Sequence, residues 1–384
     1  MALFTTEPML NSEVREETTH RALILHSTSS PLSLNTIPIP AATPGSVVVR
    51  VLGTAILPYL KDILNGTLPY AITFPMIPGS NCVARVHSVG TDSVSLTPGQ
   101  LVLCDITVRA RDDPDKAILM GLHGGAAMKL MEGEWRHGTF AEYAKFPLEN
   151  VFSLNEEILC GKLGYTIEDL CSTPAYLVPY GGLAEINLLP GDTLIVAPAT
   201  GRFGGGAVTM ALAMGATVIA CGRNAATLSA MSSVFASIGR LRTYIFTGNI
   251  ETDTANLTKL ANNGQGADAF IDFSPAAAAQ STHIQTCIAA LRPKGKAVLM
   301  GGISGKIEID YGAVMMRSLR IQGRFMYERE MVVQVVKMLE NGNLKLGEAV
   351  GCRTLGRFGL GDVEEGLVVA GREKGWGRQV VLVP

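Results

Sequence analysis

A strand, a glycine-rich turn, a helix and a second strand are expected in immediate succession between residues 194 and 223. Residues 194–197 form an apolar run with the length of a buried parallel strand. The turn ATGRFGGG, at residues 199–206, precedes a helical pattern of small residues over 207–214, and residues 217–221 form a second apolar strand. This order predicts the first half of a dinucleotide-binding fold.

The turn reads Ala-x-Gly-x-x-Gly, with Ala199 where the usual fingerprint has its first glycine. Gly201 would let the backbone approach a pyrophosphate, and Gly204 would let the helix pack closely on the strand. Free N–H groups and the positive dipole end at the helix start would then bind phosphates. The alternative is a glycine turn with a structural role only. The cofactor contacts predicted in this turn are Ala199, Thr200, Gly201, Arg202, Phe203 and Gly204.

The end of the second strand indicates which cofactor binds. An acidic residue there would hydrogen-bond to the free ribose hydroxyl of NAD, but the chain reads Gly222-Arg223-Asn224. The guanidinium of Arg223 suits a 2′-phosphate, although a solvated surface arginine is the alternative. The sequence therefore favours NADP(H). Further cofactor contacts are predicted at Gly222, Arg223, Asn224, Phe273, Ser274, Gly301, Gly302, Arg324 and Phe325.

The rest of the chain divides into two kinds of pattern. Strands alternate with helices through the middle of the chain, which is typical of a doubly wound parallel α/β sheet. Short strands between Pro and Gly turns before this region predict a β-rich, barrel-like domain, to which the tail returns. We therefore expect a Rossmann-type NADP-binding domain over residues 166–324 and a β-rich domain over residues 1–165 and 325–384.

One further helix and one long insertion are predicted outside these patterns. A helix is expected over residues 173–186, with Thr173 as its N-cap, and Pro179 should kink this helix or delay its start.

Residues 106–138 are predicted to form a long irregular insertion that carries Trp135 and several methionines. Loops of this length are usually functional or disordered, and the apolar content favours an ordered loop over a pocket.

Composition excludes several classes of protein. The net charge of −2 offers no basic footprint for nucleic acid or an anionic membrane surface. No apolar run approaches the ~18 residues of a membrane span, and the N-terminus lacks the pattern of a signal peptide. The seven cysteines are scattered, without a C-x-x-C pair, which is typical of reduced thiols. We expect a cytoplasmic protein that binds a small-molecule substrate, and neither nucleic acid nor membrane.

From about residue 20 to its end the chain resembles the medium-chain dehydrogenase/reductase superfamily. Besides the glycine turn, the resemblance rests on IPGSN at 77–81, PGQ at 98–100, GTFAEY at 138–143 and GDVEEG at 361–366, in this order and spacing. It implies a GroES-like front domain and a hydride-transferring oxidoreductase, with the active site in the cleft between the domains. It also implies a homodimer that pairs through the last strand region of the cofactor domain, here about residues 296–309.

The zinc branch of that superfamily has its metal ligands at positions that fall on Leu57, Ser80-Asn81 and Pro174. None of these can bind zinc as a thiolate or an imidazole would. The four-cysteine structural zinc lobe is also missing, since only Cys104 lies nearby. We therefore expect no metal, and the chain resembles the zinc-independent, quinone oxidoreductase-like and enoyl reductase-like branch.

Without zinc, some hydride-transfer reactions of the superfamily become less favourable than others. Zinc would polarise a carbonyl, which simple alcohol/ketone interconversion needs. Hydride addition to a conjugated C=C–C=O spreads charge into an enolate that one or two hydrogen bonds can stabilise. NADPH-dependent reduction of an activated double bond or a quinone is therefore the favoured function. The alternatives are a zinc-free alcohol/ketone oxidoreductase, a non-redox cyclase or isomerase, and a catalytically inactive NADPH-binding protein.

Three residues are candidates for the catalytic site. Tyr59 occupies the position at which zinc enzymes of the superfamily carry their proton-relay hydroxyl, and a phenol can donate to an enolate or quinone oxygen. Ser80 and Asn81 occupy positions of the lost metal site and would bind the substrate oxygen. The alternative for Tyr59 is packing at a domain edge.

Overall fold

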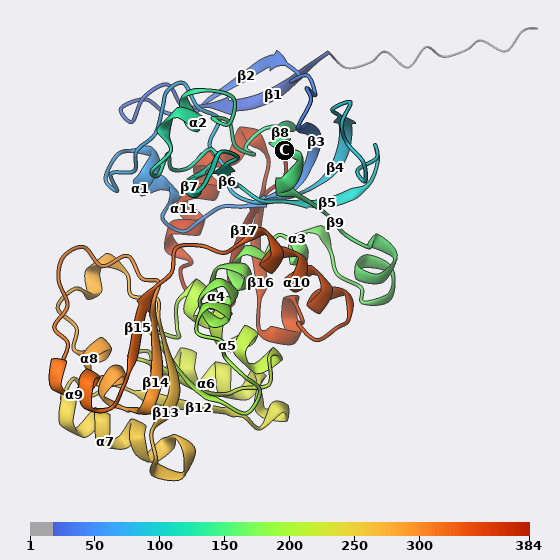
Figure 1. Ribbon diagram of the computed structural model, residues 1–384. Helices are drawn as coiled ribbons and strands as arrows, with labels where there is room; N and C mark the ends of the chain where they lie inside the picture. The colour runs from blue at the N-terminus through green and yellow to red at the C-terminus, as the bar shows by residue number, and fades with distance from the viewer. Residues whose placement is uncertain (1–17) are drawn as a thin grey trace, which may run out of the picture.

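The computed structural model describes residues 18–384. The N-terminal stretch in which no signal peptide is predicted lies almost entirely outside the described residues. Within the described chain, no helix is long and apolar enough to cross a membrane. Figure 1 shows two domains, a β-rich one above and an α/β one below, with C-terminal elements running between them.

A six-stranded parallel sheet forms the centre of the α/β domain, with strand order β12-β11-β10-β13-β14-β15. This is the doubly wound order, with the reversal beside the first strand of the domain, and it confirms the predicted fold class. The strands are β10 (Thr193–Ala197), β11 (Thr217–Gly222), β12 (Leu241–Ile245), β13 (Ala267–Asp272), β14 (Leu291–Leu299) and β15 (Arg320–Gly323).

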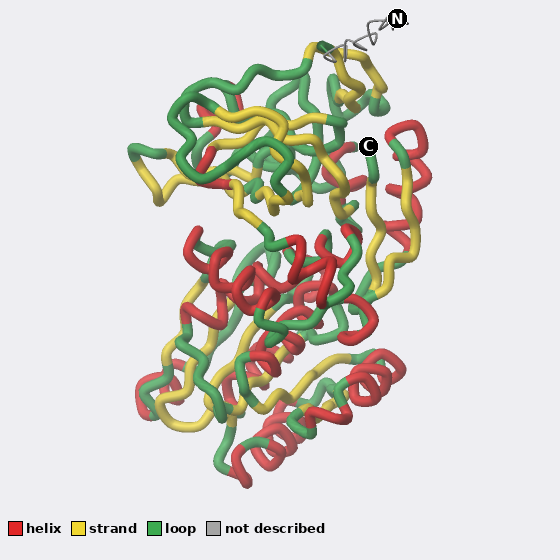
Figure 2. The backbone as a smooth tube through the Cα atoms, turned by 90° about the vertical axis from the view of Figure 1, so that its right-hand side faces the viewer, coloured by secondary structure: helices red, strands yellow, loops and turns green. Residues whose placement is uncertain are grey.

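Successive residues of β10 point to opposite faces of the sheet, as the period of a strand requires. Leu194 and Val196 pack into one apolar core and Ile195 and Ala197 into the other, and all four are fully buried. Figure 2 shows the helices on both faces of this sheet. The first core contains residues of α4 (Pro174–Glu185), α5 (Arg202–Ala213), α6 (Ala225–Val234) and α10 (Arg329–Glu340); the second contains residues of α7 (Ile250–Leu260) and α8 (His283–Ala289).

Helix α4 corrects two expectations about its beginning. Thr173 does not cap the helix with its side chain, because its hydroxyl donates to Leu170 O (2.7 Å) instead. Pro179 lies inside the helix and does not delay its start, since the helix begins at Pro174; a kink at Pro179 stays a prediction. Proline removes the N–H that would bond the carbonyl four residues earlier, that of Ala175. Gly206 of α5 lies against this carbonyl so closely that a Cβ there would be 1.9 Å from the oxygen.

The front domain is built on a seven-stranded sheet, which confirms the β-rich expectation. Its order is β16-β17-β3-β4-β5-β9, with β8 also paired to β3. Two further two-stranded sheets, β1 with β2 and β6 with β7, belong to the same domain. The strands are β1 (Thr19–Ile24), β2 (Ser33–Pro38), β3 (Ser46–Ala55), β4 (Cys82–Val89), β5 (Leu101–Cys104), β6 (Thr107–Ala110), β7 (Asp113–Leu119), β8 (Tyr143–Pro147) and β9 (Val151–Ser153); the short helices are α1 (Leu60–Leu64), α2 (Met128–Glu132) and α3 (Ile167–Leu170).

The tail returns to the front domain, as expected. Strand β17 (Arg378–Leu382) pairs antiparallel with β3 and parallel with β16 (Arg353–Phe358), and α11 (Val363–Arg372) packs on both tail strands. Helix α10 contacts α4 and so lies against the cofactor domain, although the chain has already left the last parallel strand. The domain boundaries at 165/166 and 324/325 stay a prediction.

The segment 106–138 is more regular than predicted. It contains the β6–β7 hairpin and helix α2. Met120 and Met131 are fully buried in the core of the front domain, so they stabilise the segment from inside rather than line a pocket.

Candidate functional site

The glycine turn after β10 leads directly into α5. The helix begins at Arg202, and not at 207 as the residue pattern suggested, because Gly204, Gly205 and Gly206 are helical. A Cβ at Gly204 would lie 2.0 Å from Pro198 O, so the close packing predicted for this glycine is present. Gly201 occupies the N-cap position, so the first N–H groups of the helix receive no hydrogen bond from a capping side chain. This geometry suits a phosphate.

The predicted cofactor residues gather at one edge of the parallel sheet. The carboxyl ends of β10, β11, β13, β14 and β15 meet there, because all their pairings are parallel. Gly302 N–H donates to Ser274 O (2.7 Å), which joins the ends of β13 and β14. The half-buried rings of Phe203 and Phe273 lie 6.3 Å apart, between centroids, beside the glycine turn.

Three side chains predicted to contact the cofactor are occupied by other partners. The Ser274 hydroxyl is buried and hydrogen-bonds to Asp272 and to His283 Nε2, so it supports the loop after β13. The Arg324 guanidinium forms ion pairs with Glu185 and Glu328. The Asn224 side chain caps α6 by accepting from Thr227 N (3.0 Å). Ligand contacts through these three groups are not supported.

Arg223 differs from them. It is exposed, directly after β11, and its guanidinium forms no hydrogen bond or ion pair within residues 18–384. Gly222 before it packs closely on Thr200, since a Cβ at Gly222 would lie 3.0 Å from Thr200 Cγ2. The strand end beside the glycine turn therefore presents a free guanidinium and no carboxylate.

A segment of the tail also lies on the glycine turn, which the sequence did not indicate. Trp376 N–H donates to Thr200 O (3.0 Å), and the Trp376 ring packs so closely on Gly205 that a Cβ there would lie 2.2 Å from Trp376 Cδ1. Gly375 and Gly377 on either side have positive φ, +117° and +74°, which only glycine adopts readily. A tryptophan between two such glycines is the signal that could have pointed to a tight turn there.

Tyr59 approaches this site from the front domain. It precedes α1, is half-buried, and its hydroxyl has no hydrogen-bond partner in the described chain. Burial raises the pKa of Tyr59, as does its neighbour Tyr70, and the positive charge of Arg202 partly opposes the rise. Arg202 is the first residue of α5, so a charge at the glycine turn acts on this residue of the front domain. The phenol stays protonated at neutral pH and is free to donate.

The donor groups through which Ser80 and Asn81 are predicted to bind the substrate oxygen are engaged by other partners in the structure. Both are buried in the front domain. The Ser80 hydroxyl donates to Ala55 O (2.7 Å), so its one proton is not available to a substrate oxygen. Both N–H groups of the Asn81 amide are used as well, toward Asp105 Oδ1 (3.2 Å) and Tyr327 Oη (3.1 Å).

Asn81 belongs to a buried network that connects the two domains. Tyr327, just after the cofactor domain, donates its hydroxyl to Asp105 Oδ1 (2.9 Å), and its carbonyl accepts from Arg109 Nη2 (3.0 Å). Burial raises the pKa of Asp105, and hydrogen bonds from Thr107, Tyr327 and Asn81 oppose the rise. Sequence reasoning missed this network because its members are up to 246 positions apart in the chain.

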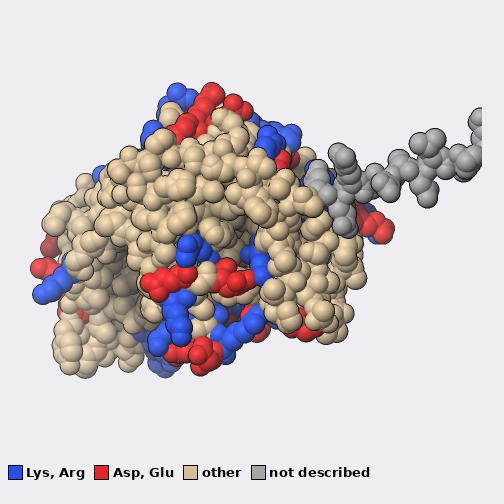
Figure 3. Space-filling model, turned by 90° about the horizontal axis from the view of Figure 1, so that it is seen from above, with Lys and Arg blue, Asp and Glu red and all other residues tan. Residues whose placement is uncertain are grey.

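A cavity of about 350 Å³ lies between the β6–β7 hairpin and the end of β15. The insertion thus lines a pocket, as predicted, although with different residues. Ion pairs join Arg109 to Glu328 (3.0 Å) and Arg324 to Glu185 (3.0 Å) along its wall. Seen from above the front domain, the surface is hollowed and charged side chains of both signs gather beside the hollow (Figure 3). The remaining lining residues are Asp115, Ala117, Gly125, Ala126, Gly323 and Phe325.

The described residues do not fit a zinc ion. They contain no group of three or more His, Cys, Asp or Glu side chains that could hold a metal. The predicted counterparts of the zinc ligands, Leu57, Ser80 and Pro174, offer an aliphatic side chain, an engaged hydroxyl and a helical proline. No step of a reaction can be derived through a metal here.

Comparison with known proteins gives two family matches and many similar structures. The family described as alcohol dehydrogenase GroES-like domain matches residues 43–156, and the family described as zinc-binding dehydrogenase matches residues 203–341. L-threonine 3-dehydrogenase of Ruegeria pomeroyi is 26% identical over 352 residues, which cover 90% of this chain and 94% of that protein.

Two solved structures show the same fold with a cofactor. A putative zinc-binding dehydrogenase from Sinorhizobium meliloti 1021, bound to NADP, has a TM-score of 0.74 at 18% identity and covers 96% of this chain and 100% of its own. A short chain alcohol dehydrogenase (rspB) from E. coli CFT073, complexed with NADH, has a TM-score of 0.75 at 18% identity, with the same coverage of both chains. One contains NADP and the other NADH.

Proposed function

The chain belongs to the medium-chain dehydrogenase/reductase superfamily, and from this we propose that it is an NADPH-dependent, zinc-independent reductase of an activated C=C bond or a quinone. The observation that carries the proposal is the Tyr59 hydroxyl, which has no hydrogen-bond partner in the described chain and feels the charge of Arg202 at the start of α5, together with the lack of a metal donor set among the described residues. The family matches support the wider statement that the protein is a nicotinamide-dependent oxidoreductase.

The proposed chemistry follows from what the side chains can supply. The bound cofactor would supply a hydride. A conjugated substrate then needs a hydrogen-bond donor for its enolate oxygen and, later, a proton. Tyr59 is the candidate donor, since it is protonated and unpaired. A saturated ketone would need a stronger electrophile than a single phenol, which is the reason to favour enones and quinones.

The function is tested by the loss of reduced-nicotinamide absorbance with a panel of 2-enones, 2-enoyl thioesters and benzoquinones. We expect NADPH oxidation with a member of this panel and none with the matched saturated ketones. Preferred turnover of saturated ketones would replace the proposal with a zinc-free alcohol/ketone oxidoreductase. NADPH binding without consumption by any compound would favour the non-redox or inactive alternatives.

Purified protein should contain far less than one zinc ion per chain, because the described residues offer no donor set for it. Elemental analysis by mass spectrometry, before and after dialysis against a chelator, measures this directly. Zinc near one ion per chain that survives dialysis would refute the zinc-independent assignment and revive the alcohol dehydrogenase alternative.

We also propose a homodimer, but through a different edge from the one first expected. Strand β14, with residues 297–299, is an inner strand between β13 and β15, so it offers no edge. The sheet has its edges at β12 and β15. The β15 edge is the one that follows β14, and α9 (Tyr311–Met316), just before β15 in the chain, exposes Tyr311, Met315 and Met316 by 81%, 60% and 80%. An open strand edge with exposed apolar side chains beside it favours association.

Light scattering at micromolar concentration should give about twice the 40.7 kDa mass of one chain. Met316→Asp should shift the protein toward the monomer, whereas Val94→Asp, at a 98% exposed position of the front domain, should not. A wild-type mass near that of one chain would contradict the dimer.

A further inference from the structure

Arg202 has an environment that its place in the chain does not explain. It is the first residue of α5, and its Nε and Nη2 atoms are buried with no hydrogen-bond partner among residues 18–384. An arginine is always charged, and leaving two of its N–H donors buried without a partner is costly, although the residue as a whole is only half-buried. In natural structures the missing partner of such a group is an ordered water, an ion or a bound ligand.

The groups around the Arg202 guanidinium are neutral. Tyr176 and Cys352 line the same pocket as Arg202. Burial raises the pKa of both groups, and the Arg202 charge opposes the rise, as it does at Tyr59 and Cys171. Asp169 also acts on Tyr176 and Cys352. Its carboxylate, however, accepts from Thr166 N (3.0 Å) and Thr166 Oγ1 (2.9 Å) as part of the cap of α3. No carboxylate of the described chain therefore bonds to the buried nitrogens of Arg202.

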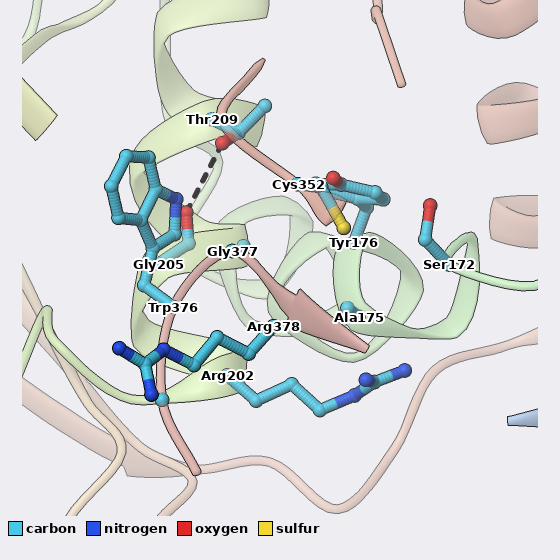
Figure 4. Close-up of a pocket in the computed structure, with 12 residues that line it drawn as sticks. Ser172, Ala175, Tyr176, Arg202, Gly205, Thr209, Cys352, Trp376, Gly377 and Arg378 are labelled. Carbon is cyan, nitrogen blue, oxygen red and sulfur yellow. Dashed lines mark hydrogen bonds between the residues drawn. The ribbon is translucent and has the colours of Figure 1, made fainter. Parts of the chain in front are cut away.

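Arg202 lies where three parts of the molecule meet. Figure 4 shows it on a small pocket between α4, α5 and the tail segment with Trp376 and Arg378. The guanidinium groups of Arg202 and Arg378 point in opposite directions. Arg378 already pairs with Glu373, whereas the buried nitrogens of Arg202 have no partner in the described part of the chain. The Arg202 charge also acts to lower the pKa of Tyr59, a residue of the front domain.

We propose that the Arg202 side chain is an anion-binding group, whose ligand is an oxyanion that enters the interdomain site beside the glycine turn. A guanidinium binds carboxylates and phosphates through two parallel N–H···O bonds, and its Nε and Nη2 atoms form such a fork. The oxyanion has two possible sources, the diphosphate of the cofactor and a carboxylate on the substrate. The choice between these two sources rests on the proposed function. The anion site itself does not, because the unpaired nitrogens of Arg202 are a feature of the protein without any ligand.

The first experiment uses the cofactor-free protein and inorganic phosphate. Phosphate should raise the melting temperature of the wild type to a plateau, and Arg202→Met should lose most of this rise. Phosphate could also bind at Arg223, so the melting temperature of Arg223→Ala is measured alongside. This variant should keep the share of the phosphate-induced rise that depends on Arg202. Lys61→Gln, which removes an exposed positive charge two positions from Tyr59, is the matched control and should behave as the wild type.

Without any added anion, Arg202→Met should melt no lower than the wild type, because the substitution removes an uncompensated buried charge. Arg202→Gln provides a second variant if the methionine does not fold. A cofactor-free melting temperature that falls in both variants, together with an unchanged response to phosphate, would show that Arg202 is structural and would overturn the proposal.

The second experiment identifies the source of the oxyanion. If it is the cofactor diphosphate, Arg202→Met should weaken NADPH binding by about 10-fold or more, and acetate should not affect the NADPH-loaded wild type. If it is a substrate carboxylate, NADPH affinity should stay within about twofold, and acetate should raise the melting temperature of the loaded wild type only. Either result supports the anion site. If Arg202→Met binds NADPH normally and acetate does not stabilise the loaded wild type, the anion site is overturned. If the wild type does not bind NADPH at all, the proposed function is overturned, and the phosphate experiment alone decides the anion site.

Discussion

Replacing Tyr59 with phenylalanine should lower turnover about 10²- to 10³-fold, the usual cost of removing one preorganised donor at a developing oxyanion. The affinity for NADPH should stay unchanged, because the phenol lies in the front domain and the cofactor residues lie on the glycine turn and at the sheet edge. The raised pKa of Tyr59 keeps the acid form present through neutral pH and into the alkaline range. Activity carried by this acid should therefore fall only as pH rises above the ordinary phenol pKa of about 10.

Tyr70→Phe is the matched control, since Tyr70 is the neighbouring phenol and its ring packs against His123. It should reduce turnover far less than Tyr59→Phe and keep the alkaline limb of the pH–rate profile. A decrease of less than about threefold in Tyr59→Phe with a good substrate would show that Tyr59 only packs the domain edge. The reverse order of the two variants would assign the acid to Tyr70.

Arg223→Ala should weaken NADPH binding by roughly 10- to 100-fold and leave NADH binding unchanged, which is the range expected when a charged hydrogen-bond pair is lost. The reason is that Arg223 is the unpaired cation at the end of β11, where an enzyme that prefers NAD would carry a carboxylate. Arg223→Asp should reverse the preference, because the carboxylate would repel a 2′-phosphate and accept from a free ribose hydroxyl.

Fluorescence titration of both cofactors measures this preference. Arg372→Ala, at an exposed arginine of α11 in the front domain, serves as a control for the loss of charge and should leave both affinities unchanged. Wild-type protein that binds NADH as tightly as NADPH would contradict the assignment, as would NADPH affinity that survives in Arg223→Ala.

Local patterns predicted the fold well where the sequence signal and the packing agree. The alternation of strands and helices predicted the parallel sheet, and the helix expected over 173–186 is observed as α4 over Pro174–Glu185. The start of α5 was missed because glycine is a poor helix former, at about 1 kcal/mol relative to alanine. Packing requires glycine there all the same, since Gly204 and Gly206 lie against carbonyl groups of other elements.

The partners of individual side chains could not be predicted from the sequence. Ser80 and Asn81 stand at the expected positions, but their hydrogen bonds to Ala55 O and to Tyr327 depend on how distant segments fold together. The unpaired guanidinium of Arg202 is likewise a property of its surroundings. A sequence shows that an arginine begins the helix, and only the packing shows that no acceptor reaches it.

The buried contacts of Tyr327 determine how the two domains can move. This residue lies where the chain passes from the cofactor domain to α10, and its hydroxyl is held in the front domain by Asp105 and Asn81. Opening the cleft at this point would leave buried polar groups unpaired, which costs more than separating exposed surfaces. Any rotation of the domains should therefore pivot about Tyr327, so that the distance between Tyr59 and the glycine turn changes while the hinge itself stays closed.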